Sequence, residues 1–148
     1  ENIKEISAKL LEKPVDLGLI GIGENAHIAF NDPPADFDTT EPYILVELDD
    51  ACKRQQVGEG WFATVDDVPK QAVTMSVHQI MQCKKIISCV PHSVKARAVS
   101  DTINSEITNR VPATILKKHC DWTLMLDKNS AALFSPQSPK DFFSLFIA

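Results

Sequence analysis

The sequence lacks several features that would place it in a simple class. Its four cysteines form no C-x-x-C pair, and no histidines stand at zinc-finger spacing. No apolar run approaches the length of a membrane span, and nothing in the first residues has the pattern of a signal peptide. The formal net charge is −5, so no basic excess is available to bind nucleic acid. We therefore expect a cytoplasmic protein with reduced thiols that binds neither nucleic acid nor membrane.

The composition is typical of a single globular domain. Of the 148 residues, 44% are hydrophobic and 24% charged, which is enough apolar material for one core. Short apolar runs alternate with amphipathic or proline-initiated helical segments along most of the chain. This alternation predicts an α/β fold: a three-layer, Rossmann-like, mostly parallel sheet with helices on both faces. We assign residues 1–134 to this domain and residues 135–148 to a linker and C-terminal tail.

Reactive side chains concentrate in one stretch, Gly21 to Asp32. The stretch follows an apolar run, Val15 to Ile20, that is typical of a strand buried on both faces. Ligands of open α/β sheets bind just beyond the carboxyl ends of such strands. Gly21 and Gly23 let the backbone turn sharply and approach a ligand closely. A carboxylate, an amide, an imidazole and a second carboxylate follow: Glu24, Asn25, His27 and Asp32. The order predicts a functional site.

A dinucleotide fingerprint is the first alternative, because Gly21, Gly23 and Ala26 satisfy G-x-G-x-x-G/A. That fingerprint requires a long helix directly after the turn. Here Pro33 and Pro34 follow instead, and prolines remove backbone donors and push the preceding residue out of the helical region. We therefore reject a dinucleotide site.

The stretch resembles the signature Gly-Ile-Gly-x-x-x-His-Ile-Ala-Phe-Asn-[Glu/Asp]-Pro of the glucosamine-6-phosphate deaminase/isomerase family. This family is related to galactosamine-6-phosphate isomerases and, more distantly, to 6-phosphogluconolactonases. The lactonase version of the motif resembles Gly-His-x-Ala-Ser-Leu-Phe, so the segment from Ile28 to Asp32 favours the amino-sugar branch. The resemblance extends from about Asp16 to about Ser130.

The resemblance implies conversion of a 2-amino-2-deoxyhexose 6-phosphate to a ketose 6-phosphate with release of ammonia, and implies no metal or organic cofactor. His27 matches the histidine that moves a proton during ring opening, for which an imidazole is suited because it titrates near neutrality. Asp32 stands where the family usually has Glu and takes its orienting role. Asn25 stands where the best-known members have Asp. Its amide can fix the histidine tautomer but cannot stabilise an imidazolium as a carboxylate does.

Lys95 and Gly23 are the candidate substrate-binding residues. Lys95 matches the phosphate-binding lysine of the family. It follows a predicted strand, residues 85–90, and stands in the first turn of a predicted helix, where free backbone N–H groups attract anions. The alternatives are a solvated surface lysine at Lys95 and a histidine that only caps a buried turn at His27.

Family members carry a further aspartate, which removes the C2 proton, and a Gly/Thr-rich phosphate loop in their N-terminal part. Neither is recognisable in the 148 residues, which begin with Glu1 rather than Met. We therefore expect the C-terminal part of a longer enzyme, inactive by itself and, by resemblance, a homo-oligomer. Two rival functions remain open: a 6-phosphogluconolactonase-like hydrolase, and a catalytically silent sugar-phosphate-binding module, which the substitution at Asn25 motivates.

Overall fold

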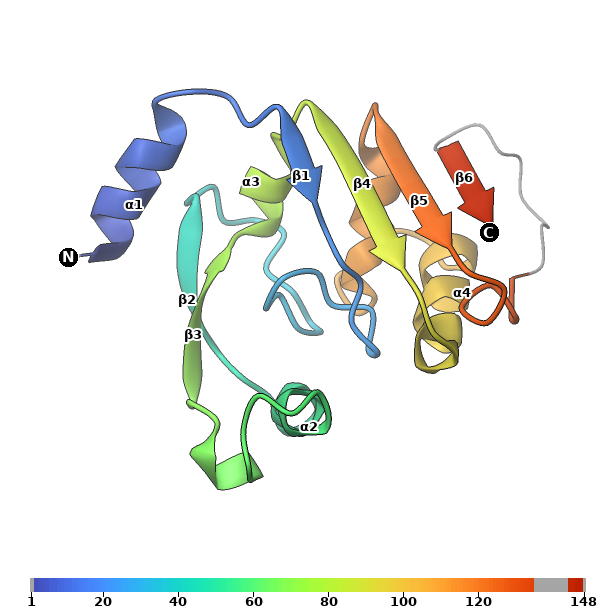
Figure 1. The fold of residues 1–148 in the computed structure, drawn as a ribbon. Helices are drawn as coiled ribbons and strands as arrows, with labels where there is room; N and C mark the ends of the chain where they lie inside the picture. The colour runs from blue at the N-terminus through green and yellow to red at the C-terminus, as the bar shows by residue number, and fades with distance from the viewer. Residues whose placement is uncertain (1, 135–143, 148) are drawn as a thin grey trace.

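The computed structural model describes residues 2–134 and 144–147. Its main sheet has four parallel strands in the order β1-β4-β5-β6 (Figure 1). These strands are β1 (Leu17–Leu19), β4 (Lys85–Val90), β5 (Trp122–Leu126) and β6 (Ser144–Ile147). A second sheet pairs β2 (Tyr43–Glu47) with β3 (Gln71–Met75) in antiparallel register. In Figure 1 the loop that follows β1 lies between the main sheet and the β2–β3 ribbon.

The described residues also form four α-helices and three short 3-10 helices, of which the first precedes β1 and the others lie between strands. They are α1 (Asn2–Leu11), α2 (Asp50–Gly58), α3 (Val77–Met81), α4 (Ala96–Asn104), η1 (Val65–Asp67), η2 (Ser93–Lys95) and η3 (Pro112–Lys118). Local capping explains where two of them begin. The Asp49 carboxylate accepts the backbone N–H of Cys52, and the Ser76 hydroxyl accepts that of Gln79. None of these described helices combines the length and apolarity that a membrane crossing requires.

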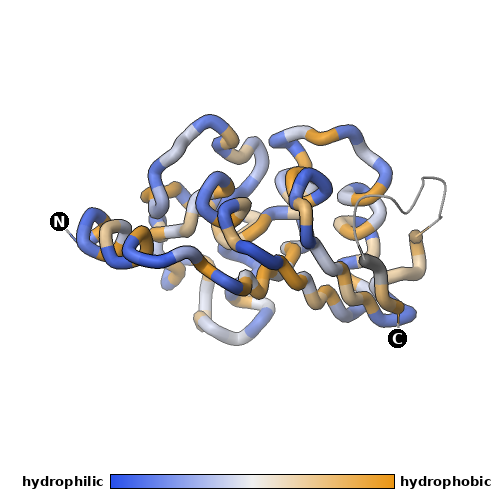
Figure 2. Tube along the Cα trace, turned by 90° about the horizontal axis from the view of Figure 1, so that it is seen from above, coloured by the Kyte–Doolittle hydropathy of each residue, from blue (hydrophilic) through white to orange (hydrophobic). Residues whose placement is uncertain are grey.

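The core lies between one face of the main sheet and the helices α3, α4 and η3. Alternate strand residues point into it because successive side chains of a strand face opposite ways. Its most buried large members are Ile28, Ile80, Ile86, Val99, Leu116, Trp122 and Leu124. Burial of each such side chain contributes about 2 kcal/mol. In the view of Figure 2, hydrophobic segments are frequent in the middle of the trace, and hydrophilic segments are frequent along its outline. The mostly parallel α/β fold expected from the sequence is confirmed.

The opposite face of the sheet is open around its first strand. Leu17 is 47% exposed and Leu19 73% exposed, whereas Gly18 between them is buried. The prediction of a strand buried on both faces is therefore wrong for the described residues. β1 is shorter than the apolar run suggested and lies at an edge of the sheet, where the described residues cover only its Gly18 side.

The segment that we assigned to the C-terminal tail contributes a strand. β6 pairs in parallel with β5, with Phe146 opposite Met125. Residues 144–147 thereby extend the main sheet. The rest of the predicted linker and tail, residues 135–143 and 148, lies outside the described residues.

Candidate active site

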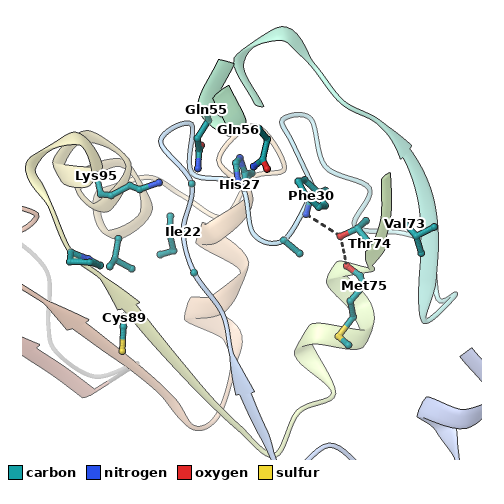
Figure 3. Close-up of a pocket in the computed structure, with 15 residues that line it drawn as sticks. Ile22, His27, Phe30, Gln55, Gln56, Val73, Thr74, Met75, Cys89 and Lys95 are labelled. Atoms are coloured by element: carbon teal, nitrogen blue, oxygen red, sulfur yellow. Dashed lines mark hydrogen bonds between the residues drawn. The ribbon is translucent and has the colours of Figure 1, made fainter. Parts of the chain in front are cut away.

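A cavity of about 550 Å³ opens at the carboxyl ends of β1 and β4, where ligands of parallel sheets bind (Figure 3). Its volume lies in the range of small-molecule sites. The loop after β1, the strands β3 and β4, the turn after β4 and one face of α2 form its wall. The lining residues are Gly21, Ile22, Gly23, His27, Ala29, Phe30, Gln55, Gln56, Val73, Thr74, Met75, Cys89, Val90, Pro91 and Lys95.

The loop after β1 is a closed turn rather than the start of a long helix. The backbone N–H of Gly23 donates to the carbonyl of His27 at 2.9 Å, and Ala26 N–H donates to the Gly23 carbonyl at 3.0 Å. Ala26 and Ala29 have φ values of 65° and 51°, which is left-handed backbone that a right-handed helix cannot contain. Residues 32–42 then form bends and extended chain. This geometry agrees with rejection of the dinucleotide fingerprint.

Long-range hydrogen bonds fix this turn against β3. The Asn31 side-chain amide donates to the carbonyls of Ile28 and Met75, both at 2.9 Å. The backbone N–H of Phe30 donates to the Thr74 hydroxyl at 3.0 Å. The turn is therefore held by residues 44 positions away in sequence.

His27 is held through one ring nitrogen by two acceptors. Its Nδ1 lies 2.6 Å from the Asn25 Oδ1 and 3.0 Å from the Asp32 Oδ1. Asn25 Nδ2 donates to the same Asp32 oxygen at 3.2 Å, which sets the orientation of the amide. Because both neighbours of Nδ1 are acceptors, we assign the proton of the neutral ring to Nδ1. Nε2 then carries the lone pair, and no described residue forms a hydrogen bond with it.

A second buried histidine shows what a purely structural imidazole looks like here. His119 is 5% exposed, and its Nε2 donates to the carbonyl of Cys83 at 2.7 Å. Its Nδ1 accepts the backbone N–H of Asp121 at 3.1 Å. Both nitrogens of His119 are thus used inside the fold. His27 differs because only Nδ1 is used while the ring lines a cavity, which is the arrangement of a proton acceptor.

The environment of Asp32 favours its ionised form. Burial raises the pKa of this carboxyl group, but hydrogen bonds from His27 and Asn25 and the charge of a protonated His27 outweigh burial, so the pKa lies below its ordinary value. Only 10% of the side chain is exposed. Cys52 of α2 lies beside it, and burial together with the charges of Asp32 and Asp49 raises the pKa of this thiol to about 12. Asp32 is therefore a buried anion that can stabilise an imidazolium at His27.

Gly23 makes room for the imidazole. A Cβ atom built on Gly23 would overlap the ring of His27, whereas a Cβ on Gly21 meets nothing within 4 Å. Neither glycine has a positive φ. The requirement for glycine at position 23 is therefore steric, and the ring of His27 packs directly on its backbone.

Lys95 supplies positive charge to the cavity. It ends η2, which leads directly into α4, so the first N–H groups of α4 are already used: those of Lys95 and Ala96 donate to the carbonyls of His92 and Ser93. The turn before it is fixed by the Asp127 carboxylate, which accepts the backbone N–H of His92 at 3.0 Å. Of the described residues that line the cavity, Lys95 alone carries a Lys, Arg, Asp or Glu charge. The cavity is therefore suited to an anion.

Comparison with curated proteins finds relatives named glucosamine-6-phosphate deaminase. No protein-family model matches the chain. The chain is 39% identical over 126 residues to a glucosamine-6-phosphate deaminase of Clostridium botulinum (strain Eklund 17B / Type B), an alignment that covers 85% of the chain and 49% of the relative. It is 40% identical over 124 residues to the Oenococcus oeni enzyme of the same name, covering 84% of the chain and 51% of that relative. The chain is homologous to glucosamine-6-phosphate deaminases. It spans about half the length of the curated relatives it matches.

Solved structures of other proteins share the fold of this chain. A monomeric glucosamine-6-phosphate deaminase of the NagB superfamily superposes with a TM-score of 0.81 at 30% identity, over 88% of this chain and 53% of the other. The 6-phosphogluconolactonase of Leishmania guyanensis superposes with a TM-score of 0.64 at 18% identity, over 90% and 52% of the two chains. At that identity the lactonase shows a shared fold only.

The structure brings together the five residues that we selected from the deaminase-family motif and its surroundings. His27, Gly23 and Lys95 line the cavity, while Asn25 and Asp32 lie behind His27 and hold its ring. Their roles in catalysis and substrate binding remain predictions.

Several residues in and around the cavity were not predicted from the sequence. Asn31 lies inside the recognised motif, and its position next to the reactive residues was the available signal. Thr74, Gln55 and Gln56 stand far from the motif in sequence, and no local pattern marks them. No group of three or more His, Cys, Asp or Glu side chains in the described part of the chain is arranged to hold a metal ion.

Proposed function

We propose that this chain provides the ring-opening and phosphate-binding part of an amino-sugar-phosphate deaminase. The enzyme would convert glucosamine 6-phosphate or galactosamine 6-phosphate to a ketose 6-phosphate and ammonia. The observation that carries the proposal is the state of His27, whose Nδ1 proton is held by Asn25 and Asp32 while its ring lines the cavity with Nε2 unused. The homology to glucosamine-6-phosphate deaminases supports the same reaction.

Ring opening requires one group that first accepts and then donates a proton. In the proposed step, Nε2 of His27 takes the proton of the anomeric hydroxyl as the bond between C1 and the ring oxygen breaks. The imidazolium then gives this proton to the ring oxygen, which leaves an open-chain aldehyde and a neutral histidine. The buried Asp32 carboxylate stabilises the intermediate imidazolium. Asn25 keeps the ring in the tautomer that presents Nε2.

The phosphate group of the substrate would bind at Lys95. The Lys95 ammonium group supplies a full positive charge to the cavity, and a positive charge there attracts an anionic group. The steps proposed here use no metal or organic cofactor, and we assign no residue of this chain to removal of the C2 proton.

A cytoplasmic location and a homo-oligomeric state remain predictions. The solved relative with the TM-score of 0.81 is described as monomeric, so the oligomeric state of this protein needs its own measurement. Light scattering of the purified protein provides it.

The test is ammonia release from glucosamine 6-phosphate and galactosamine 6-phosphate, measured for the 148-residue chain and for the longest product of its gene. We expect His27→Ala to lower turnover by at least about 100-fold, the usual contribution of a general acid–base group. His78→Gln is the control, because His78 does not line the cavity. Hydrolysis of 6-phosphogluconolactone by a protein that releases no ammonia would replace the proposal with the lactonase function. Binding of amino-sugar phosphate with neither reaction would replace it with the silent binding module.

A further inference from the structure

One face of α2 is directed at the candidate active site. Cys52, in the first turn of the helix, is 1% exposed and lies beside Asp32. Gln56 follows four residues later, so it stands on the same side of the helix one turn further along. Both Gln55 and Gln56 line the cavity, and Figure 3 shows them reaching from α2 toward the part that His27 lines. Because Cys52 packs against the site, it sets the position of Gln55 and Gln56 one turn further along α2.

The polar side chains of the cavity wall are few, and most of them already have a partner. The Thr74 hydroxyl accepts the backbone N–H of Phe30 and donates to the carbonyl of Met75. The side-chain amide of Gln55 donates to Glu59 at 2.7 Å. The side-chain amide of Gln56 forms no hydrogen bond with any described residue, and its side chain is only partly exposed.

We propose that Gln56 is a substrate-binding residue that forms hydrogen bonds with the sugar hydroxyl or amino groups beside His27 and thereby discriminates between sugar phosphates. This inference rests on the proposed function and extends it to the substrate class that the site selects. A primary amide both donates and accepts, so it matches a hydroxyl group, which does the same. It carries no charge, so it is not suited to replace Lys95 at the phosphate. Lys95 would then supply affinity for the phosphate, and Gln56 would select the sugar.

The physical basis of such selection is the cost of an unpaired polar group. A site built to bond a hydroxyl rejects an analogue that leaves its buried polar atoms unpaired. Replacing Gln56 with leucine removes both hydrogen-bonding atoms and keeps a good helix former of similar size. We expect the Michaelis constant for the amino-sugar phosphate to rise about tenfold, the effect of one or two hydrogen bonds between uncharged groups. The ratio of activities on glucosamine 6-phosphate and galactosamine 6-phosphate should move toward one.

The experiment compares Gln56→Leu with Gln71→Leu in the longest product of the gene. Gln71→Leu makes the same change at an exposed position of β3 that does not line the cavity, in a side chain whose amide is bound to Glu47. We expect it to change the Michaelis constant about twofold or less. Inhibition by inorganic phosphate is the second readout, because a probe without hydroxymethyl or ring groups reports on the Lys95 region alone. It should be the same in wild type and Gln56→Leu and weaker in Lys95→Met.

Three results would overturn the assignment. They are equal Michaelis constants for the two leucine variants, an unchanged preference between the two sugars, and a parallel weakening of inorganic phosphate inhibition in Gln56→Leu, which would indicate general distortion of the site. If wild type releases no ammonia, the proposed function fails separately, and the same variants are compared by NMR titration with glucosamine 6-phosphate. Tenfold weaker binding in Gln56→Leu alone then supports the role of Gln56, and absence of binding to wild type refutes it.

Discussion

Substitution of Gly23 with alanine should disrupt the site through a single methyl group. The added Cβ would occupy space that the imidazole of His27 fills. Overpacking of this kind costs about 1–3 kcal/mol. If the ring rotates away instead, its hydrogen bonds to Asn25 and to the buried Asp32 carboxylate break, and hydrogen bonds to a charged group contribute about 1.5–3 kcal/mol. After the gain of about 0.5 kcal/mol from a stiffer unfolded chain, we expect the free energy of unfolding to fall by about 0.5–2.5 kcal/mol.

Gly21→Ala is a matched control two residues away in the same turn. No atom lies within 4 Å of its added Cβ, and its φ is not positive. The methyl group should therefore only restrict the unfolded chain and raise the free energy of unfolding by about 0.5 kcal/mol. The two variants carry the same chemical change, so the difference between them isolates the contact with His27.

Urea denaturation of both variants, followed by circular dichroism, measures this difference. A supporting readout is the ¹⁵N NMR spectrum of the His27 ring, in which the Nδ1-protonated pattern should be retained in Gly21→Ala and lost in Gly23→Ala. In the ammonia assay, Gly23→Ala should lose most activity even under conditions where it is folded. The steric reasoning would be refuted if the free energies of unfolding of the two variants agreed within about 0.5 kcal/mol. Such agreement would show that the position of the His27 ring does not require glycine at position 23.

Three further predictions concern the stability and reactivity of the chain. The pKa of Asp32 is lowered in the folded state, so the charge of Asp32 stabilises the fold at neutral pH and this contribution is lost as the pH falls below about 4. The difference in unfolding free energy between wild type and Asp32→Asn should therefore shrink between pH 6 and pH 3, and a difference that grows would contradict it. With Ellman's reagent, Cys89 and Cys120 should react rapidly because both are exposed, whereas Cys52 and Cys83, whose thiol pKa values are raised mainly by burial, should react only on unfolding. Ala29→Gly should raise the free energy of unfolding by about 0.5 kcal/mol, because relief of left-handed backbone at φ 51° exceeds the entropic cost of glycine at this exposed position, and a loss of stability would exclude strain there.

The cluster of reactive residues could be predicted because it is local. Asn25, His27 and Asp32 stand within eight consecutive positions, and a turn that folds them together is encoded by the same stretch. The strand before the turn and the helix after Lys95 were likewise visible as apolar and helical patterns. The position of β1 at the edge of the main sheet could not be predicted from such patterns. The run around Leu17 and Leu19 has the composition of a buried strand, but which strands flank it is decided by the sheet order.

The sequence by itself determined which side chains surround His27 within its own turn, and only the tertiary structure decided what faces the ring across the cavity. Thr74 and Met75 meet the turn from 44 positions away, and Gln56 arrives on a separate helix. These contacts depend on how β3 and α2 pack against the turn after β1. The reason is physical: short-range backbone preferences fix a turn from its own residues, whereas a cavity wall depends on long-range packing in which each contributing segment looks ordinary when it is considered alone.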